Sequence, residues 1–132
     1  MFRKHAGFTM IELLVVLALI GLIAGIALPR LWGQVTKAQQ RQAVENIWSL
    51  TFSNIRAELR SGRAVALDAD FVRQATAKRE QLEQWQVEVP VAIVYRPHKV
   101  TTGGDIYLSD QEGASWLINI SRLDGHVEIR QR

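Results

Sequence analysis

The stretch GFTMIELLVVLALIGLIAGIALP, residues 7–29, decides how the rest of the chain is organised. Between Phe8 and Leu28 its only ionisable residue is Glu12. As a helix rising about 1.5 Å per residue, Phe8 to Leu28 spans roughly 31 Å, which is close to the thickness of the hydrocarbon core of a bilayer. The sequence therefore predicts one membrane-spanning helix over residues 8–29.

An ordinary secretory signal is the alternative reading of this segment. Such a signal has an apolar run of about 7 to 15 residues, and its small-residue cleavage site follows that run. Here the small residue Gly7 precedes the apolar run. Arg3 and Lys4 lie before the segment and favour a cytoplasmic start, although the basic residues that follow Pro29 weaken the contrast across the bilayer.

Glu12 is the residue of this segment that needs compensation. A carboxylate in the apolar part of a membrane helix costs several kcal/mol unless it is neutralised or paired. The side chain could reach the nearby interface, or it could meet a cationic partner. We favour the partner, whose identity the physics alone leaves open.

Residues 7–16, GFTMIELLVV, resemble the prepilin cleavage and methylation motif of type IV pilins and type II secretion pseudopilins. The resemblance implies that a membrane prepilin peptidase cuts between Gly7 and Phe8. Residues 1–7 would then be a discarded leader, and the new amine of Phe8 would be N-methylated.

The same resemblance gives Glu12 and Pro29 roles in assembly. It implies that the Glu12 carboxylate pairs with the terminal ammonium of Phe8 on a neighbouring subunit, so that two buried charges cancel. Breaking such a pair by removing one member is costly, and the pair therefore specifies register. Pro29 stands where the family carries a helix-perturbing proline.

Beyond Pro29 the apolar residues keep a helical spacing. One predicted face carries Val44, Trp48, Phe52, Ile55 and Leu59, at steps of three and four residues. We interpret its aromatic pair as core packing. Residues 30–62 are therefore predicted to continue the helix as an amphipathic segment, kinked near Pro29 and stopped at Gly62.

Residues 63–132 are predicted to form a small antiparallel β head. Apolar residues alternate with polar ones in four places: Trp85 to Val89, Ile106 to Leu108, Trp116 to Ile120, and Val127 to Ile129. Turn residues at 103–104, 110–113 and 124–125 separate them, which indicates a meander covering the upper half of the helix. The predicted fold class is α+β, with a long N-terminal helix packed against the sheet.

Two shorter elements are expected between the long helix and this meander. Residues 64–67 could form a short strand. Asp68 or Asp70 could cap a second helix that starts near Phe71 and fades by Trp85.

The C-terminal half is similar to minor subunits of the H-type pseudopilin and FimT-like group, over residues 60–65, 103–108 and 123–129. This resemblance implies a minor pseudopilin, a structural subunit of a type II secretion pseudopilus involved in protein export. The alternative is a minor type IV pilin for pilus assembly, adhesion, motility or DNA uptake.

Partners and location follow from the same resemblance. It implies a prepilin peptidase, other pseudopilins or pilins in a hetero-oligomeric filament, and an inner-membrane assembly platform. It also implies a single pass through the cell inner membrane, with the head at 63–132 in the periplasm.

Catalytic chemistry finds little support in the sequence. Cysteine is absent, which excludes disulfides and thiol chemistry. His5, His98 and His126 are scattered, and the chain has neither a Gly-rich phosphate loop after a strand nor a nucleophile elbow. We therefore predict no enzyme, no catalytic residue and no cofactor.

A metal site is not predicted either. Asp105, Asp110 and Glu112 share a turn region, and major pseudopilins bind calcium in a loop of this kind. Their spacing here matches no defined calcium loop, so we interpret them as solvated turn carboxylates.

Charge gives a second hypothesis. Removing Arg3 and Lys4 with the leader leaves fourteen basic and thirteen acidic residues, so the basic excess of a typical nucleic-acid binder is missing. A local basic surface could still form on the final hairpin and serve DNA contact, since some FimT-like pilins act in DNA uptake. Ordinary solvated strand ends are the simpler interpretation of its members, Arg96, Lys99, Arg122, Arg130 and Arg132.

Overall fold

The computed structural model describes residues 7–98 and 100–132. The leader residues 1–6, with Arg3, Lys4 and His5, lie outside the described residues, and so does Lys99. The chain divides into two compact units between Gln39 and Gln40.

One long helix, α1 (Met10–Arg60), belongs to both units and is continuous through Pro29. Its end has a defined cap. The amide of Arg63 donates to the Glu58 carbonyl at 3.2 Å, and the amide of Gly62 donates to the Leu59 carbonyl at 3.0 Å. This pair of bonds is the Schellman motif, which needs a left-handed residue, and Gly62 supplies it with a φ of 81°. The helix stop predicted at Gly62 is confirmed.

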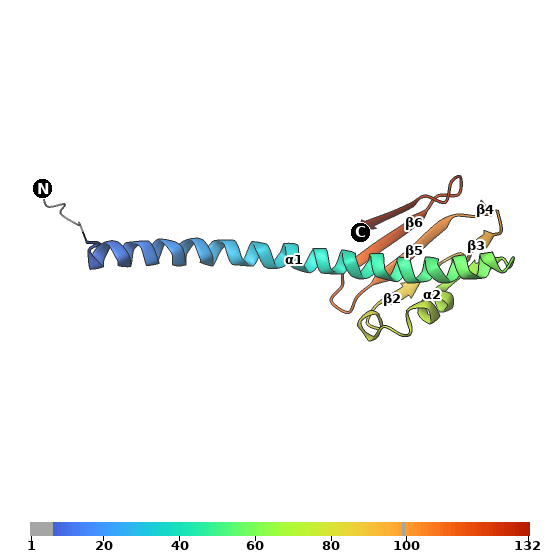
Figure 1. The fold of residues 1–132 in the computed structure, drawn as a ribbon, viewed down its shortest axis with the longest axis horizontal. Coiled ribbons are helices and arrows are strands. Elements are labelled where there is room, and N and C mark those ends of the chain that lie inside the picture. Colours follow the sequence, from blue (N-terminus) through green and yellow to red (C-terminus); the bar gives the residue numbers. More distant parts are fainter. Residues whose placement is uncertain (1–6, 99) are drawn as a thin grey trace, which may run out of the picture. The chain divides into compact units, whose positions relative to one another are not determined.

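In the second unit, short elements follow α1 and form two antiparallel sheets, ordered β1-β3-β4 and β2-β5-β6-β7 (Figure 1). The elements are β1 (Val65–Leu67), α2 (Ala69–Thr76), the 3-10 helix η1 (Glu80–Leu82), β2 (Gln86–Glu88), β3 (Ile93–Arg96), β4 (Val100–Thr101), β5 (Gly104–Ser109), β6 (Ser115–Ile120) and β7 (Val127–Gln131). The predicted α+β class, with a long helix and a small antiparallel β head, is confirmed.

The four strands predicted to form a meander do so, because β2, β5, β6 and β7 are antiparallel neighbours in that order. A second sheet, ordered β1-β3-β4, was not predicted. β2 pairs with β5, and the segment between them forms β3 and β4, which join β1 in a separate sheet. The burial pattern of β3 does alternate, with Ile93 and Tyr95 inside. It alternates over only four residues, however, and β4 has two, which is too short for a period of two to be recognised.

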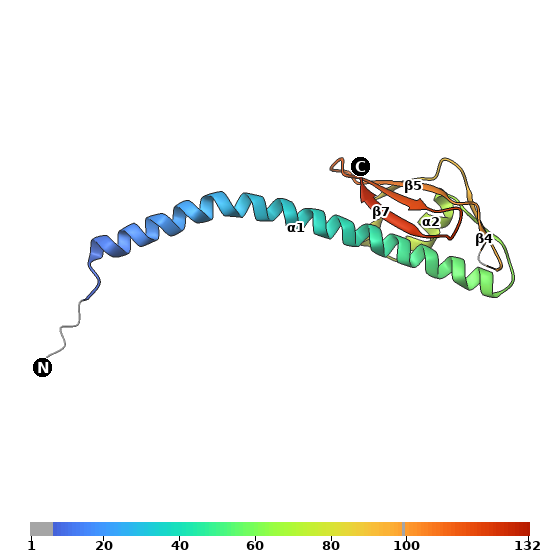
Figure 2. The same ribbon diagram turned by 90° about the horizontal axis from the view of Figure 1, so that it is seen from above.

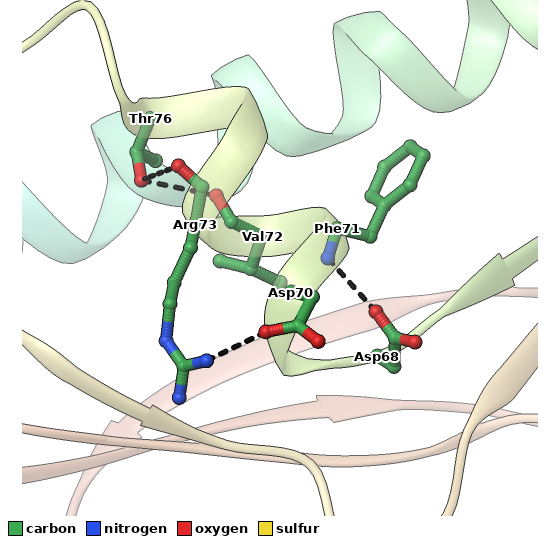
Figure 3. A network of polar contacts seen from close by, with 6 residues as sticks. All are labelled: Asp68, Asp70, Phe71, Val72, Arg73 and Thr76. Carbon is green, nitrogen blue, oxygen red and sulfur yellow. Dashed lines mark hydrogen bonds and ion pairs between the residues drawn. The ribbon is translucent and has the colours of Figure 1, made fainter.

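The helix α2 starts where a cap was predicted but ends earlier than expected. The Asp68 carboxylate accepts a hydrogen bond from the Phe71 amide at 2.8 Å, as Figure 3 shows. The helix ends at Thr76, and a turn and η1 occupy the stretch towards Trp85. The Thr76 hydroxyl donates to the carbonyls of Val72 and Arg73, a local bond that competes with helix continuation.

The core of the head lies between the sheets and the part of α1 after Gln40, and Figure 2 shows the strands along one side of these turns. The buried helix residues are Val44, Ile47, Thr51 and Ile55. Trp48, Phe52 and Leu59, predicted on the core face, are only half-buried at its margin. The buried face of α1 is therefore rotated about the helix axis from the predicted face, towards Ile47 and Thr51.

Two adjacent glycines join the two sheets. A Cβ on Gly103 would lie 2.7 Å from the Arg122 amide nitrogen, and one on Gly104 would lie 2.7 Å from Ile93 Cγ1. Gly103 also has a φ of 66°. The chain therefore needs glycine here to pass this close to the β6–β7 connection and to β3.

Candidate functional site

The candidate site is the exposed apolar part of α1 and the residues just before it. In the described part of the chain, α1 is the one helix long and apolar enough to cross a membrane, and its most apolar window contains no buried residue. The core helix of a soluble protein passes the same length test, but such a helix is mostly buried. Exposure therefore favours an environment of lipid or neighbouring helices.

Exposed large apolar side chains are concentrated in this segment. Seventeen of them lie between Phe8 and Val35, and three lie elsewhere in the described residues. The run continues past the predicted membrane boundary, because Leu31, Trp32 and Val35 are exposed as well. The apolar surface is therefore longer than the segment 8–29 that the sequence predicted to span the membrane.

The beginning of the helix places the motif residues together. Gly7, Phe8 and Thr9 precede α1, and the Phe8 side chain is 77% exposed. The Thr9 hydroxyl accepts a hydrogen bond from the Glu12 amide at 3.3 Å, and the Thr9 carbonyl accepts one from the Leu13 amide at 3.2 Å. Thr9 is thus the N-cap of α1.

Sequence reasoning missed this role of Thr9, although a signal was present. A Thr followed three residues later by Glu is the capping-box pattern. With this cap, α1 begins at Met10, two residues after the predicted cut between Gly7 and Phe8, and Glu12 lies in its first turn.

Glu12 has only weak local compensation. The positive end of the helix dipole stabilises a nearby carboxylate by about 0.3 to 1 kcal/mol, against a cost of several kcal/mol in lipid. Among the described residues, none of the salt bridges includes Glu12. A cationic partner from outside the described residues remains the interpretation that fits this balance.

Pro29 lies within α1 and has no amide hydrogen. The carbonyl of Gly25, four residues earlier, therefore lacks its usual helical donor. This weakens the helix at one point inside the exposed apolar run.

Two carboxylates of the predicted turn region make hydrogen bonds that support the structure, Asp105 between strands and Asp110 within the turn. Asp105 accepts a hydrogen bond from the Asn119 side chain at 2.6 Å. Asp110 accepts from the amides of Glu112 and Ala114, at 3.0 and 2.7 Å. Within the described ranges, no group of three or more Asp, Glu or His residues is placed to hold a metal ion.

Two of the arginines considered for a basic surface, Arg122 and Arg132, lie far apart. Arg132 lies beside the start of β6, where its amide donates to the Ser115 carbonyl at 2.9 Å. Arg122 follows the other end of that strand, so the two backbone positions are roughly 20 Å apart at about 3.3 Å per residue. Arg132 also packs over the Tyr107 ring, with Cζ 5.2 Å from the ring centroid. Arg122 and Arg132 therefore do not share one site.

The comparisons with known proteins agree with the placement of the candidate site. The model of the prokaryotic N-terminal methylation motif matches residues 2–28. The chain is also similar to type II secretion system core protein G of three bacteria. It is 40% identical to the Aeromonas hydrophila protein over 48 residues, 42% identical to the Vibrio cholerae protein over 48, and 40% identical to the Escherichia coli protein over 47.

These matches are short. Each covers 36% of this chain and 34%, 33% and 32% of the respective relatives, so the chain matches about a third of their length, in an N-terminal stretch. No solved structure matches the chain. With its methylation motif and its homology to core protein G, the N-terminal segment of this chain is that of a type IV pilin-like protein.

Proposed function

We propose that this chain is a structural subunit of a pilin-like filament, held in the inner membrane by α1 before assembly and without a reaction of its own. The observation that carries the proposal is the run of exposed apolar side chains from Phe8 to Val35, which begins inside the matched methylation motif. Full burial of one such side chain contributes about 1.5 to 3 kcal/mol. Lipid can cover this surface first, and the helices of neighbouring subunits can cover it in a filament.

Maturation is the second part of the proposal. A prepilin peptidase removes residues 1–7, and the amine of Phe8 is methylated. The ammonium of Phe8 from one subunit then meets the Glu12 carboxylate of another. The exposed positions of Phe8 and Glu12 at the start of α1 support this, because both groups are free of core contacts in the described chain.

The finer proposal is a minor pseudopilin of a type II secretion pseudopilus, acting in protein export with its head in the periplasm. Similarity to core protein G supports the secretion system. A head that falls outside the matched third is compatible with a specialised subunit. A minor type IV pilin is the second candidate, because the physics of the N-terminal segment serves both filaments equally.

Glu12→Ala tests the proposal in cells that assemble the filament. We expect normal removal of residues 1–7 and a strong loss of the chain from sheared filaments, because the Phe8 ammonium loses its partner. Glu45→Ala is the matched control, since Glu45 is another exposed glutamate of α1 and, within the described ranges, its one salt bridge is to Arg41 at 2.9 Å. Recovery of the Glu12 variant in filaments at the wild-type level would refute the pairing.

A further inference from the structure

We propose that the head binds the surface of an anionic phospholipid membrane through the end at which α1 stops. Lipid phosphate occupies a basic hollow there, and Leu123 enters the boundary between headgroups and acyl chains. The residues of this surface belong to the head unit alone. The inference goes beyond the proposed role in a filament, and its test does not depend on that role.

The basic hollow lies between the last turns of α1 and the β3–β4 turn. It has a volume of about 530 Å³ and is lined by Ser53, Arg56, Leu59, Arg60, Pro97 and His98. Within the described residues, this lining carries two guanidinium groups and an imidazole and has no acidic side chain. Guanidinium groups bind phosphate oxygens through pairs of N–H donors, so the hollow has the composition of a site for a phosphate group.

Arg56 is held in place without being neutralised. Its Cζ lies 5.3 Å from the centroid of the Phe52 ring, which itself stacks on Trp48 at 5.5 Å. The ring face attracts the guanidinium and does not use its N–H donors. Neither Arg56 nor Arg60 takes part in a salt bridge within residues 7–98 and 100–132. Both guanidinium groups are therefore available to an anion.

Leu123 supplies an apolar contact from the β6–β7 turn. Its side chain is 97% exposed, the largest fraction among the exposed large apolar residues of the described chain. Backbone hydrogen bonds fix the turn that carries it: the Ser121 amide donates to the His126 carbonyl at 2.8 Å, and the Gly125 amide donates to the Ser121 carbonyl at 3.0 Å. A leucine presented on a fixed turn enters an apolar phase at little cost in ordering.

The turn that carries Leu123 lies beside β4, and β4 follows the turn that lines the basic hollow. A Cβ on Gly125 would lie 3.6 Å from Thr101 Cγ2. Val100, the residue before Thr101, is 54% exposed and is the cross-strand partner of Arg96. Figures 1 and 2 show β4 at the end of the head where α1 stops. Two exposed apolar side chains are thus combined with the basic hollow at one end of the head.

The charge of this end is positive. Four exposed arginines lie outside the salt bridges of the described chain: Arg56, Arg60, Arg96 and Arg122. Two carboxylates lie nearby. Glu58 is paired with Arg63 at 3.7 Å, and Asp124 accepts a hydrogen bond from the His126 amide at 3.0 Å. The excess of cations attracts an anionic surface, to which each basic residue adds about 5-fold in affinity.

The apolar residues favour lipid over a nucleic acid as the occupant. Cations alone are sufficient to bind a phosphate backbone. An exposed leucine between cations instead suits a membrane surface, where apolar side chains are buried below the headgroups and basic ones bind the phosphates.

The full chain, held by its apolar segment in lipid discs of phosphatidylcholine, tests binding to separate vesicles. We expect flotation of the loaded discs with vesicles that contain phosphatidylglycerol, but not with vesicles of phosphatidylcholine alone, and no flotation of empty discs. The absence of cysteine allows one environment-sensitive dye to be attached. The emission of a dye at Leu123→Cys should shift to the blue on the anionic vesicles, whereas a dye at Gln111→Cys, in the β5–β6 turn, should not respond.

Two sets of variants separate the charged contribution from the apolar one. Arg56→Gln with Arg60→Gln should lower the association constant for anionic vesicles at least about 10-fold, and Leu123→Ser should lower it at least about 5-fold. Lys78→Gln with Arg79→Gln is the matched control, because it removes two exposed charges from the turn after α2 and should change binding by at most about 2-fold. A thermal midpoint near the wild-type value in each variant separates lost binding from lost folding.

Equal binding to both kinds of vesicle would overturn the inference, and so would anionic binding that neither variant lowers. Binding of duplex DNA without binding of vesicles would assign the basic surface to a nucleic acid instead. A chain that enters filaments normally but does not bind anionic vesicles would refute this membrane contact and leave the proposed function intact. A chain that binds the vesicles but is neither cut after Gly7 nor found in filaments would refute the proposed function alone.

Discussion

The two parts of α1 have the same backbone and opposite surroundings. Before Gln40 the large apolar side chains are exposed, whereas after it Val44, Ile47 and Ile55 are buried under the sheets. The apolar side chains of the second part are covered by the sheets of the same chain. Those of the first part can be covered only by lipid or by other subunits. One continuous helix thus combines a folding element with an assembly element.

The largest difference should appear in the stability of the head. Ile55 is fully buried, so Ile55→Ala should lower the free energy of unfolding by about 2 to 5 kcal/mol, through lost burial and a residual cavity. Ile26 is 62% exposed, and Ile26→Ala should change it by less than about 0.5 kcal/mol. Denaturant unfolding of the detergent-solubilised chain, followed by tryptophan fluorescence, measures both. Equal effects would contradict the division of α1.

Membrane insertion should show the reverse order. Ile20→Arg should make insertion of residues 8–29 less favourable by about 2.5 to 3.5 kcal/mol, since a guanidinium near the centre of the segment must be placed in lipid. Ser49→Arg, at an exposed site on the head part of α1, should leave insertion unchanged. An insertion assay that reports the apparent free energy tests this pair. An insertion free energy that does not change in Ile20→Arg would contradict the prediction that residues 8–29 span the membrane.

A smaller effect should separate two neighbouring aspartates of the head. Asp68→Ala removes the cap of α2 and should cost about 1 kcal/mol of unfolding free energy. Asp70 makes an exposed ion pair with Arg73 at 2.7 Å (Figure 3), and Asp70→Ala should cost only about 0.2 to 0.5 kcal/mol. Chemical denaturation of the two variants measures the difference, and a larger loss for Asp70→Ala would show that the cap contributes little.

The smallest effect at neutral pH should come from Tyr95 in β3. Burial raises the pKa of Tyr95 to about 12, and the Thr101 side chain opposes this only in part. The two side chains do not meet the geometry of a full hydrogen bond, because the Tyr95 hydroxyl has no partner among the described residues. Tyr95→Phe should therefore be close to neutral at pH 7.

The same tyrosine gives the head a predicted alkaline limit. Below pH 10 the Tyr95 phenol is neutral in both the folded and the unfolded chain, so the free energy of unfolding does not depend on its ionisation there. As the pH rises from about 10 to about 12, the unfolded chain ionises first and the free energy of unfolding falls. Tyr95→Phe should flatten this part of the stability profile, measured by denaturant midpoints. An unchanged slope between pH 10 and 12 would assign the loss to other groups.

The sequence predicted best those elements whose signals are local. Asp68 and Gly62 act through bonds to residues within five positions, and both were located correctly. The strands β5 and β6 alternate over six residues each, which is long enough for the period to be read. The short strands β3 and β4 depend on pairing with β1 across the chain, which no local pattern specifies.

The buried face of α1 shows why hydrophobic spacing alone did not identify the residues that enter the core. Trp48 and Phe52 are more apolar than Thr51, and hydrophobic spacing therefore selected them. Thr51 is nonetheless buried, because its hydroxyl donates to the Ile47 carbonyl at 2.7 Å and leaves a small side chain for packing. In the candidate site, Glu12 was recognised by its cost in lipid. The separation of Arg122 from Arg132 depends on how β6 and β7 pair, which no local pattern specifies.

Intact mass of the membrane-extracted chain, co-expressed with a prepilin peptidase, tests the central claim most directly. The account predicts loss of residues 1–7 and addition of one methyl group to Phe8, with both changes abolished or strongly reduced in Gly7→Ala. Among the described residues, no heavy atom lies within 4 Å of a Cβ built on Gly7, so Gly7→Ala should leave the fold unchanged. An uncut wild-type chain, or a cut near Ala27, would contradict the account and indicate a simple anchored or secreted domain.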